Sequence, residues 1–369
     1  MKATKTKHKP LIVLTAGGTG GHVYPAESLA EELEKRGYRL ALITDNRGKD
    51  NYKGHLGQIP NYAVWSGSIV GKSKWFKLKS LAKTAIGVLQ AGWILIKEKP
   101  VCVVGFGGYA SFPACMAAIL LGTDLVIHEQ NSVMSRTNRF LSKYATLIAQ
   151  SFRKVKYTPN GIKTVLTGMP VRANIVEVGQ KEFAAPEDKM QIMVLGGSQG
   201  AKVFGEVLPE AMAKLAPAMQ AKIKIFQQCR KGDEDMIAAA YQKTKCQVTV
   251  EHFFQNMAEL YASTQLIISR AGASSVSEIA VTGVPSILVP LLIAADDHQT
   301  YNAQEIAEAK AGLVIKQTEF TAEKVKTVVE DLIKHPDNLV KMSANAKKAG
   351  IKDAAQRLAD AIEKNIIRH

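Results

Sequence analysis

His22 follows a glycine-rich segment near the start of the chain, in the sequence AGGTGGHVYP at residues 16–25. Glycines let a ligand approach main-chain N–H groups closely, and a neutral imidazole beside them can accept a proton at pH 7. The apolar segment LIVLT (11–15) predicts a strand before the glycines, and apolar residues at helical spacing follow them up to Gly37. The segment predicts either a ligand site at a helix start or a tight turn that binds nothing.

A second glycine-rich turn occurs in the other half of the chain, in QIMVLGGSQGAKVFGEVL (191–208). It repeats the order strand, glycine turn and helix, so two such units in 369 residues predict two α/β domains. The first turn is not a dinucleotide fingerprint, because Val23 stands where a third glycine would be required. We therefore do not interpret Asp45 as a ribose-binding acid, although it follows at about the expected distance.

Short apolar segments that predict strands alternate with helical patterns in both halves. The predicted strands are residues 11–15, 39–44, 101–105, 124–128 and 146–150, then 191–195, 223–226, 248–250, 266–269 and 286–289. This alternation predicts an α/β fold of two Rossmann-like domains with parallel sheets, whose ligands bind at the carboxyl ends of the strands and in the cleft between domains. We expect a first domain at 1–172, a linker at 173–190 and a second domain at 191–347, followed by a charged helical tail.

Polar residues follow several predicted strands, among them HEQN (128–131) and DDHQTYN (296–302). In AGASSVSEIA (271–280), small residues bring N–H groups to a helix start, which forms an anion site. Glu278 follows one turn into that helix, where its carboxylate either accepts hydrogen bonds from a cis-diol such as ribose or caps the helix. Arg172, after the last strand of the first domain, is either a surface arginine or neutralises a diphosphate.

Composition indicates a globular protein with anionic partners, since 46% of residues are hydrophobic and the net charge is +15. No apolar segment reaches the length of about 20 residues that spans a membrane. The basic N-terminus lacks the apolar region and cleavage site of a signal peptide. Four cysteines without paired spacing predict reduced thiols in the cytoplasm.

Seven motifs in order, GGTGGHVYPA, GFGGYASFPA, HEQN, PVR, GGSQGA, RAGASSVSEIA and DHQTYNA, resemble the MurG family of bacterial glycosyltransferases over nearly the whole chain. The resemblance implies a GT-B fold, with the C-terminal helix (348–369) returning to the first domain. It implies a hexosyltransferase that moves N-acetylglucosamine from UDP-N-acetylglucosamine to the C4 hydroxyl of the muramyl sugar of lipid I, giving lipid II for peptidoglycan. The partners would be UDP-N-acetylglucosamine, lipid I and the cytoplasmic face of the bacterial inner membrane, where the enzyme would be peripheral.

The resemblance also implies roles for individual residues. Glu278 would bind the ribose, Phe254 would lie by the uracil, and Gln299 would contact the donor sugar. Arg172 and Ser198 would meet the diphosphate. The remaining donor-site candidates fall into two groups. The glycine turn and the HEQN segment would border the sugar and the acceptor side, through Thr19, Gly20, Gly21 and Asn131. The AGASSVSEIA segment would hold phosphate and ribose, through Ala273, Ser274, Ser275, Val276 and Ser277 together with Glu278.

The reaction implied by the resemblance is an inverting displacement, so the attacking hydroxyl must lose a proton on the acceptor side. His22 is the candidate general base, and His128 is its rival. Glu129 is a further catalytic candidate. Alternatively, His22 only hydrogen-bonds the acceptor or the turn.

The sequence departs from the family pattern at two places, both on the acceptor side or at the domain junction. Met169 stands where the family usually has asparagine, and Met134-Ser135 stand where it often has Pro-Gly. These departures affect the expected geometry of the acceptor loop but leave the donor site unchanged.

The segment 71–99 is basic and amphipathic and too short to span a membrane, which is typical of an interfacial helix. For residues 72–83 we favour membrane contact, through Lys72, Lys74, Trp75, Phe76, Lys77 and Lys79. For residues 85–96 we favour a buried crossover helix with solvated lysines.

Two other functions fit parts of the pattern. A UDP-N-acetylglucosamine 2-epimerase of the same fold would share the donor site but need no lipid. A basic nucleic-acid-binding protein would need interleaved aromatics, and only 7% of residues are aromatic, so we expect no nucleic acid. We expect no metal and no cofactor, because Arg172 and a helix start can neutralise a diphosphate without Asp296 and Asp297.

Overall fold

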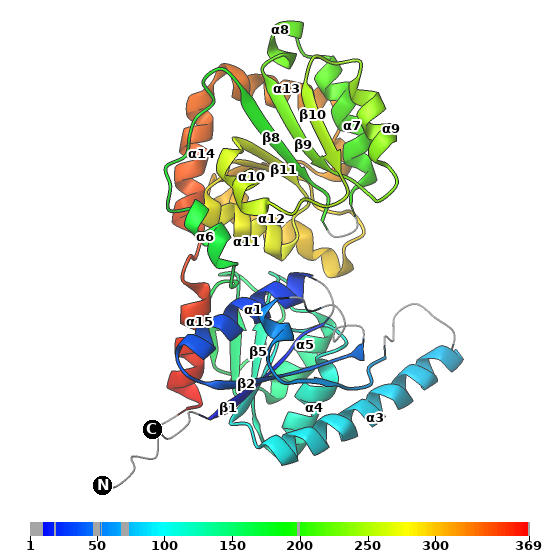
Figure 1. Cartoon of the computed structure of the whole chain (residues 1–369), viewed down its shortest axis with the longest axis vertical. Coiled ribbons are helices and arrows are strands. Elements are labelled where there is room, and N and C mark those ends of the chain that lie inside the picture. The colour runs from blue at the N-terminus through cyan, green and yellow to red at the C-terminus, as the bar shows by residue number, and fades with distance from the viewer. Residues whose placement is uncertain are drawn as a thin grey trace. The chain divides into compact units, whose positions relative to one another are not determined.

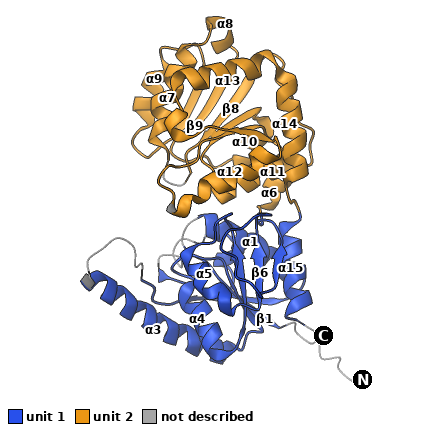
Figure 2. Ribbon diagram, turned by 180° about the vertical axis from the view of Figure 1, so that it is seen from behind, with its two compact units in different colours: residues 1–170, 353–369 blue, residues 171–352 orange. Residues whose placement is uncertain are grey.

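The computed structural model describes residues 10–17, 20–46, 52, 54–67, 74–197 and 200–367, apart from the side chains of residues 74 and 295. The chain divides into two compact units, unit 1 with residues 1–170 and 353–369, and unit 2 with residues 171–352 (Figure 2). Each unit contains one parallel sheet with its own apolar core, which is the arrangement that the two repeated strand–turn–helix segments predict.

The sheet of unit 1 has the strand order β3-β2-β1-β4-β5-β6-β7 (Figure 1). Its strands are β1 (Leu11–Thr15), β2 (Arg39–Thr44), β3 (Asn61–Ala63), β4 (Cys102–Gly105), β5 (Asp124–Glu129), β6 (Leu147–Gln150) and β7 (Thr164–Leu166). The order reverses at β1, which lies between β2 and β4. Thr15 at the end of β1 pairs with Gly105 at the end of β4, so the segments after these two strands emerge side by side at the switch point, where such sheets bind ligands.

Helices cover both faces of this sheet. They are α1 (Gly20–Lys35), α3 (Lys74–Glu98), α4 (Phe112–Leu121), α5 (Arg136–Leu141) and α15 (Ala354–Asn365). Ile12 and Leu14 belong to a core cluster with α1 and α15, whereas Leu11 and Val13 belong to a cluster with α3 and α4. Because side chains alternate along a strand and both faces are buried, β1 is apolar throughout.

The last helix, α15, packs on α1 of unit 1 although unit 2 precedes it in the chain (Figure 2). Arg36 at the end of α1 donates to Asp360 and Glu363 of α15, at 2.6 and 2.8 Å. Tyr38 donates its hydroxyl to Glu363 at 2.9 Å, and burial together with this carboxylate raises the pKa of Tyr38 to about 12. Apolar side chains, among them Leu358 and Ile362, complete the core cluster beneath these polar contacts.

Unit 2 has the strand order β10-β9-β8-β11-β12-β13, again with parallel neighbours (Figure 1). The strands are β8 (Met190–Leu195), β9 (Ile223–Gln228), β10 (Gln247–Glu251), β11 (Leu266–Ser269), β12 (Ser286–Leu288) and β13 (Gly312–Val314). The helices are α6 (Ala173–Val178), α7 (Lys202–Ala213), α8 (Pro217–Gln220), α9 (Glu234–Tyr241), α10 (Met257–Ser263), α11 (Ala273–Thr282), α12 (His298–Glu308), α13 (Ala322–Lys334) and α14 (Pro336–Ala349). The switch point of this sheet lies between β8 and β11.

The ten predicted strands all form, with ends that differ by at most a few residues. Three further strands, β3, β7 and β13, have three residues each and give no clear apolar pattern. The expected linker begins with α6 and belongs to unit 2, because Ile175 of α6 is buried and α6 packs on α10 and α11. The expected charged helical tail consists of α14 on unit 2 and α15 on unit 1.

Candidate active site

His22 lies in the first turn of α1, against two consecutive glycines that follow β4. Gly107 and Gly108 have φ angles of +82° and +80°, a conformation that residues with a Cβ rarely adopt. A Cβ on Gly107 would be 3.5 Å from His22 Cε1, and one on Gly108 would be 3.4 Å from Cδ2. The imidazole of His22 therefore packs against the turn that contains Gly107 and Gly108.

The two nitrogens of the His22 ring have different surroundings. Nδ1 is buried and has no hydrogen bond of normal geometry among the described residues. Nε2 lies on the side of Gly108, 3.6 Å from the position of a Cβ there. Burial lowers the pKa of His22 below its usual 6.5, although Phe106 and Gln130 oppose this as hydrogen-bond acceptors. The imidazole is therefore neutral at pH 7, and Nε2 is the nitrogen left for a substrate.

His128 is at the end of β5 and fully buried. Its Nε2 is 3.2 Å from the main-chain oxygen of Gly168, and its Nδ1 is 3.2 Å from Nε2 of Gln130. Burial lowers the pKa of His128 to about 4. Since protein atoms occupy both ring nitrogens, the geometry favours His22 over His128 as the base.

Glu129 is also fully buried, and burial raises the pKa of its carboxyl group. Its Oε1 accepts hydrogen bonds from Asn131, at 2.9 Å from the main-chain N and 3.5 Å from Nδ2. Its Oε2 accepts from the main-chain N of Ser135 at 3.1 Å and from Asn138 Nδ2 at 2.7 Å. These contacts fix the loop that follows β5, which is a positioning function rather than proton transfer.

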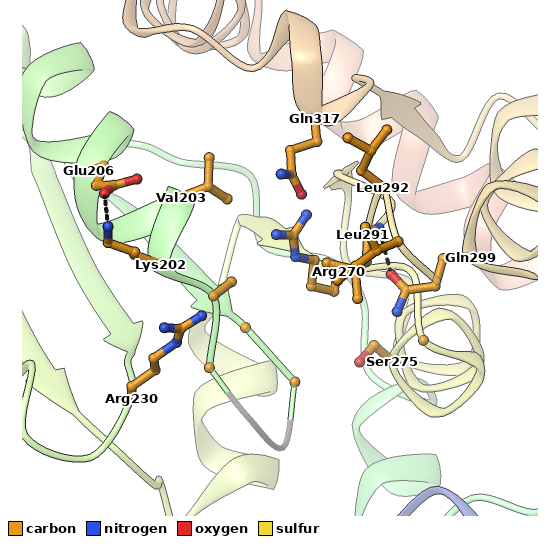
Figure 3. A pocket seen from close by; sticks show the side chains of 16 residues that line it. Lys202, Val203, Glu206, Arg230, Arg270, Ser275, Leu291, Leu292, Gln299 and Gln317 are labelled. Atoms are coloured by element: carbon orange, nitrogen blue, oxygen red, sulfur yellow. Dashed lines mark hydrogen bonds and ion pairs between the residues drawn. The ribbon is translucent and has the colours of Figure 1, made fainter. Parts of the chain in front are cut away.

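In unit 2, the start of α11 combines open N–H groups with unpaired polar atoms. Gly272 is the N-cap residue and offers no side-chain cap. Ser274 Oγ is buried and has no partner among the described residues, which fits a site completed by a ligand. Gln299 Oε1 accepts from the main-chain N of Ala271 at 3.2 Å and of Leu291 at 3.0 Å, so its amide nitrogen remains for a ligand (Figure 3).

Glu278, one turn into α11, is held by two side chains. Its Oε2 accepts the hydroxyl of Tyr261 at 2.9 Å, and its Oε1 accepts Arg172 Nη2 at 3.3 Å. Burial and the nearby carboxylate raise the pKa of Tyr261 well above its usual value, so its hydroxyl is always a donor. The structure thus brings the predicted ribose residue and the predicted diphosphate residue together. The sequence did not predict a role for Tyr261, because its position in α10 indicates only a residue of the apolar core.

A cavity of about 570 Å³ lies at the carboxyl edge of the unit 2 sheet (Figure 3). Its lining includes Gly196, Gly197, Gly200, Lys202, Arg230, Arg270, Gly272, Ser275, Leu291, Leu292, Ile293, Gln299 and Gln317. Arg270 is buried, donates to the main-chain oxygens of Val289 and Pro290, and has no acidic partner in the described part of the chain. The cavity therefore joins the glycine turn, the start of α11 and a buried cation, which suits an anionic ligand.

The other predicted site residues are placed as follows. Gly20 and Gly21 begin α1, and Ala273, Val276 and Ser277 lie in the first turns of α11, with Ala273 and Val276 buried. Phe254 is buried, with its ring edge-on to Phe226 at 6.0 Å between centroids. Thr19, Ser198, Lys72 and the side chain of Lys74 lie outside the part of the chain that is described.

Helix α3 carries large apolar side chains in contact with solvent along its whole length. In its first half these are Trp75, Phe76, Leu78 and Leu81, with Trp75 81% exposed; in its second half they are Ile86, Leu89, Trp93 and Ile96, with Leu89 74% exposed. Only one side of the second half, Ala91, Ile94 and Leu95, is buried. The expectation that residues 85–96 form a buried crossover helix is therefore wrong for the outward side.

No helix among the described residues is long and apolar enough to cross a membrane. No group of three or more His, Cys, Asp or Glu side chains among them is placed to hold a metal ion.

Comparisons with known proteins match both halves of the chain. The model of the glycosyltransferase family 28 N-terminal domain matches residues 12–150, and that of the family 28 C-terminal domain matches residues 191–358. A protein of Paramagnetospirillum magneticum is 44% identical over 96% of this chain and 96% of its own, and one of Rhodospirillum rubrum is 41% identical over 95% and 91%. Both are named "UDP-N-acetylglucosamine--N-acetylmuramyl-(pentapeptide) pyrophosphoryl-undecaprenol N-acetylglucosamine transferase".

Two solved structures are similar to this chain over nearly its whole length. The crystal structure of Acinetobacter baumannii MurG is 32% identical, with a TM-score of 0.76 over 96% of this chain and 99% of its own. A UDP-GlcNAc 2-epimerase from Neisseria meningitidis has a TM-score of 0.68 over 96% of this chain and 100% of its own, at 14% identity. The epimerase resemblance concerns the fold alone.

Proposed function

The chain belongs to glycosyltransferase family 28, and we propose that it transfers N-acetylglucosamine from UDP-N-acetylglucosamine to undecaprenyl-pyrophosphoryl-N-acetylmuramyl-pentapeptide, which makes lipid II for peptidoglycan. It is a hexosyltransferase of the GT-B fold. The observation that supports this function most strongly is the start of α11, where Tyr261 orients Glu278 and the buried Ser274 hydroxyl has no partner among the described residues.

The donor binds to unit 2 in this proposal. The ribose hydroxyls donate to Glu278, whose oxygens keep lone pairs beside their bonds to Tyr261 and Arg172. The diphosphate takes the N–H groups at the start of α11 and the Ser274 hydroxyl, because a helix start favours anions. The amide nitrogen of Gln299 donates to the sugar. Arg172 exchanges part of its contact with Glu278 for the diphosphate.

The acceptor sugar binds to unit 1 beside the two glycine turns. Its C4 hydroxyl oxygen attacks the anomeric carbon of N-acetylglucosamine as the bond from that carbon to the diphosphate oxygen breaks. UDP leaves with the electron pair, and the hydroxyl proton passes to Nε2 of His22, which burial keeps neutral. Gly107 and Gly108 let the imidazole pack closely against the turn after β4, because neither carries a side chain.

Helix α3 holds the enzyme at the cytoplasmic face of the bacterial inner membrane. Its exposed tryptophans and aliphatic side chains enter the interface, while Lys77, Lys79, Lys83 and Lys97 meet anionic lipid. Because the second half of the helix is apolar on its outward side too, the contact extends beyond residue 83. This placement brings unit 1 to the membrane that contains the polyprenyl acceptor.

The test is transfer of labelled N-acetylglucosamine from the UDP-sugar to a lipid I analogue. Formation of a disaccharide product with release of one UDP per transfer supports the proposal. Conversion of UDP-N-acetylglucosamine to its C2 epimer without any acceptor would identify an epimerase instead. Unchanged substrates in the presence of both donor and acceptor would contradict the transferase assignment.

A further inference from the structure

Gln130 lies between the two histidines of unit 1, and its amide orientation follows from its contacts. Nε2 is 2.8 Å from the main-chain oxygen of Phe106 and 3.1 Å from that of His128. Carbonyl oxygens only accept hydrogen bonds, so the nitrogen of the amide must face them. Gln130 is buried, at 2% exposure, and its side-chain oxygen therefore has one fixed direction.

A main-chain oxygen determines the proton position on His128. His128 Nε2 lies 3.2 Å from the main-chain oxygen of Gly168, and since a carbonyl oxygen only accepts, the proton of neutral His128 is on Nε2. Nδ1 then has the lone pair, and Gln130 Nε2, 3.2 Å away, shares its two N–H groups among Nδ1 and the two main-chain oxygens. His128 is thus a fixed part of the support around Gln130.

The oxygen of Gln130 lies near the His22 ring, and the Gln130 side chain raises the pKa of His22 as a hydrogen-bond acceptor. Gln130 Oε1 and His22 Cε1 are 3.6 and 3.5 Å from the same point, the position of a Cβ on Gly107. Nδ1 of His22 is on the buried side of the ring and lacks a bond of normal geometry, whereas Nε2 faces Gly108. Contacts of this kind are often loose without substrate and tighten when it binds.

We propose that Gln130 is a positioning residue that fixes the reactive tautomer of His22, by accepting a hydrogen bond from Nδ1–H so that Nε2 carries the lone pair. The proposal rests on the proposed function of His22 as base. When Nε2 takes the acceptor proton, the ring becomes an imidazolium with protons on both nitrogens, and Gln130 Oε1 with the oxygen of Phe106 stabilises its charge. Without the amide oxygen, part of the His22 population would carry its proton on Nε2 and could not act as a base.

Of the described groups near His22, Gln130 is the one whose replacement tests what selects the His22 tautomer. Among the described residues, His128 on β5 is the titratable group with an electrostatic effect that couples it to His22. From the described part of the α1 turn and the glycine turn after β4, the main-chain oxygen of Phe106 is the group that acts on the ring as a hydrogen-bond acceptor. The amide of Gln130 is therefore the side-chain group that can select between the two tautomers.

The experiment compares the full-length chain with its Gln130→Met variant, which has similar side-chain volume but no amide. Nitrogen-15 NMR of labelled histidine reads the tautomer directly, and His22→Gln identifies the His22 signals among the 8 histidines. We expect wild-type His22 to be protonated on Nδ1 at pH 8, and the variant to contain the Nε2–H tautomer. We expect kcat to fall about 10- to 100-fold with the KM for donor unchanged, and the acidic limb of the kcat profile to move to lower pH.

The matched control is Gln220→Met in unit 2. Gln220 is also buried, and its Nε2 also donates to two main-chain oxygens, of Ala213 and Leu215. It should leave the His22 signals and kcat unchanged. An Nε2–H tautomer in the wild type, or an identical tautomer and pH profile in Gln130→Met, would overturn the proposal. Because NMR needs no acceptor, failure of the proposed transferase function would be recognised separately, by absent product with an unchanged tautomer.

Discussion

The hydroxyl of Tyr261 on α10 donates to Glu278 Oε2 on α11 at 2.9 Å, and the ring of Tyr261 is fully buried. A hydroxyl that stays protonated can only orient the carboxylate, so Tyr261 sets the direction of Glu278 before any ligand binds. Preorganised groups lose less entropy on binding than mobile ones.

Glu278→Ala should weaken UDP-N-acetylglucosamine binding about 10- to 100-fold, because hydrogen bonds to a charged group contribute about 1.5–3 kcal/mol. Tyr261→Phe keeps the Glu278 carboxylate but removes the hydrogen bond that orients it, so this variant should weaken donor binding at most about 10-fold. Calorimetric titration with UDP-sugar and with its 2′-deoxy analogue measures both. From wild type to Glu278→Ala, the affinity for the deoxy analogue should fall by a smaller factor than the affinity for the natural donor. Equal donor affinity in wild type and Glu278→Ala would remove the ribose assignment.

His22→Ala should lower kcat about 10²- to 10⁴-fold and leave donor affinity nearly intact, because a general base acts only in the transition state. Since burial lowers the pKa of His22 below 6.5, the neutral base form is populated above that lowered pKa and lost below it. The wild-type kcat should therefore fall on the acidic side below pH 6.5, and this limb should flatten in the variant. Steady-state kinetics over pH 5 to 9 with a soluble acceptor checks the prediction. A variant that loses donor affinity alone would argue against proton transfer by His22.

Unit 1 should lose stability as the pH falls from about 6.5 toward 4. The pKa of His128 is lowered to about 4 in the folded state from its usual 6.5. Between pH 6.5 and pH 4 the unfolded chain therefore binds more protons than the folded chain, and the free energy of unfolding falls as the pH falls through this range. One such group gives a slope of about 1.4 kcal/mol per pH unit. Urea unfolding followed by tryptophan fluorescence reports on unit 1, because Trp65, Trp75 and Trp93 all belong to it.

His128→Gln tests the origin of that slope. The variant lacks the titratable ring, so its free energy of unfolding should depend less on pH between 6.5 and 4, whatever its value at pH 7. The readout is the slope and not the absolute stability, which removal of a buried ring also changes. The same slope in wild type and variant would assign the acid sensitivity to other groups.

Replacement of Lys72, Lys74, Lys77 and Lys79 by glutamine should release the protein from anionic vesicles, because each lysine near such a surface contributes about 1 kcal/mol. Leu89→Ser with Trp93→Ser should also weaken binding, since both side chains are exposed in the second half of α3. Activity on a short-chain soluble acceptor should persist in both variants. Vesicle co-sedimentation at several salt concentrations provides the measurement.

The control for the lysine variant removes the same charge from unit 2. Lys310, Lys324, Lys341 and Lys348 are all exposed and lie away from α3 in sequence. Their replacement by glutamine should leave vesicle binding largely intact. Equal release by both sets would mean that net charge, and not α3, holds the protein to the vesicle.

Sequence reasoning predicted the strands that are buried on both faces, because an uninterrupted apolar run such as LIVLT leaves few alternatives. It missed β13, where Leu313 and Val314 are partly exposed at the edge of the sheet and only three residues pair. It misjudged the second half of α3, because apolar residues on both sides of a helix do not reveal which side is covered. Tyr261 and Gln130 were unassigned because their functions depend on partners distant in sequence or on the direction of an amide.

Because α15 packs on unit 1, the core of unit 1 is completed only after unit 2 has been synthesised. Synthesis delivers residues 1–170 first, then all of unit 2, and only then the helix that supplies Leu358 and Ile362 to the first core. Until that helix emerges from the ribosome, the face of α1 that it covers is exposed, and Arg36 lacks the two α15 carboxylates that it will bind. Unit 2 can therefore finish folding before unit 1, so the unit that contains His22 is completed last, and the acceptor site proposed there forms only after α15 has been made.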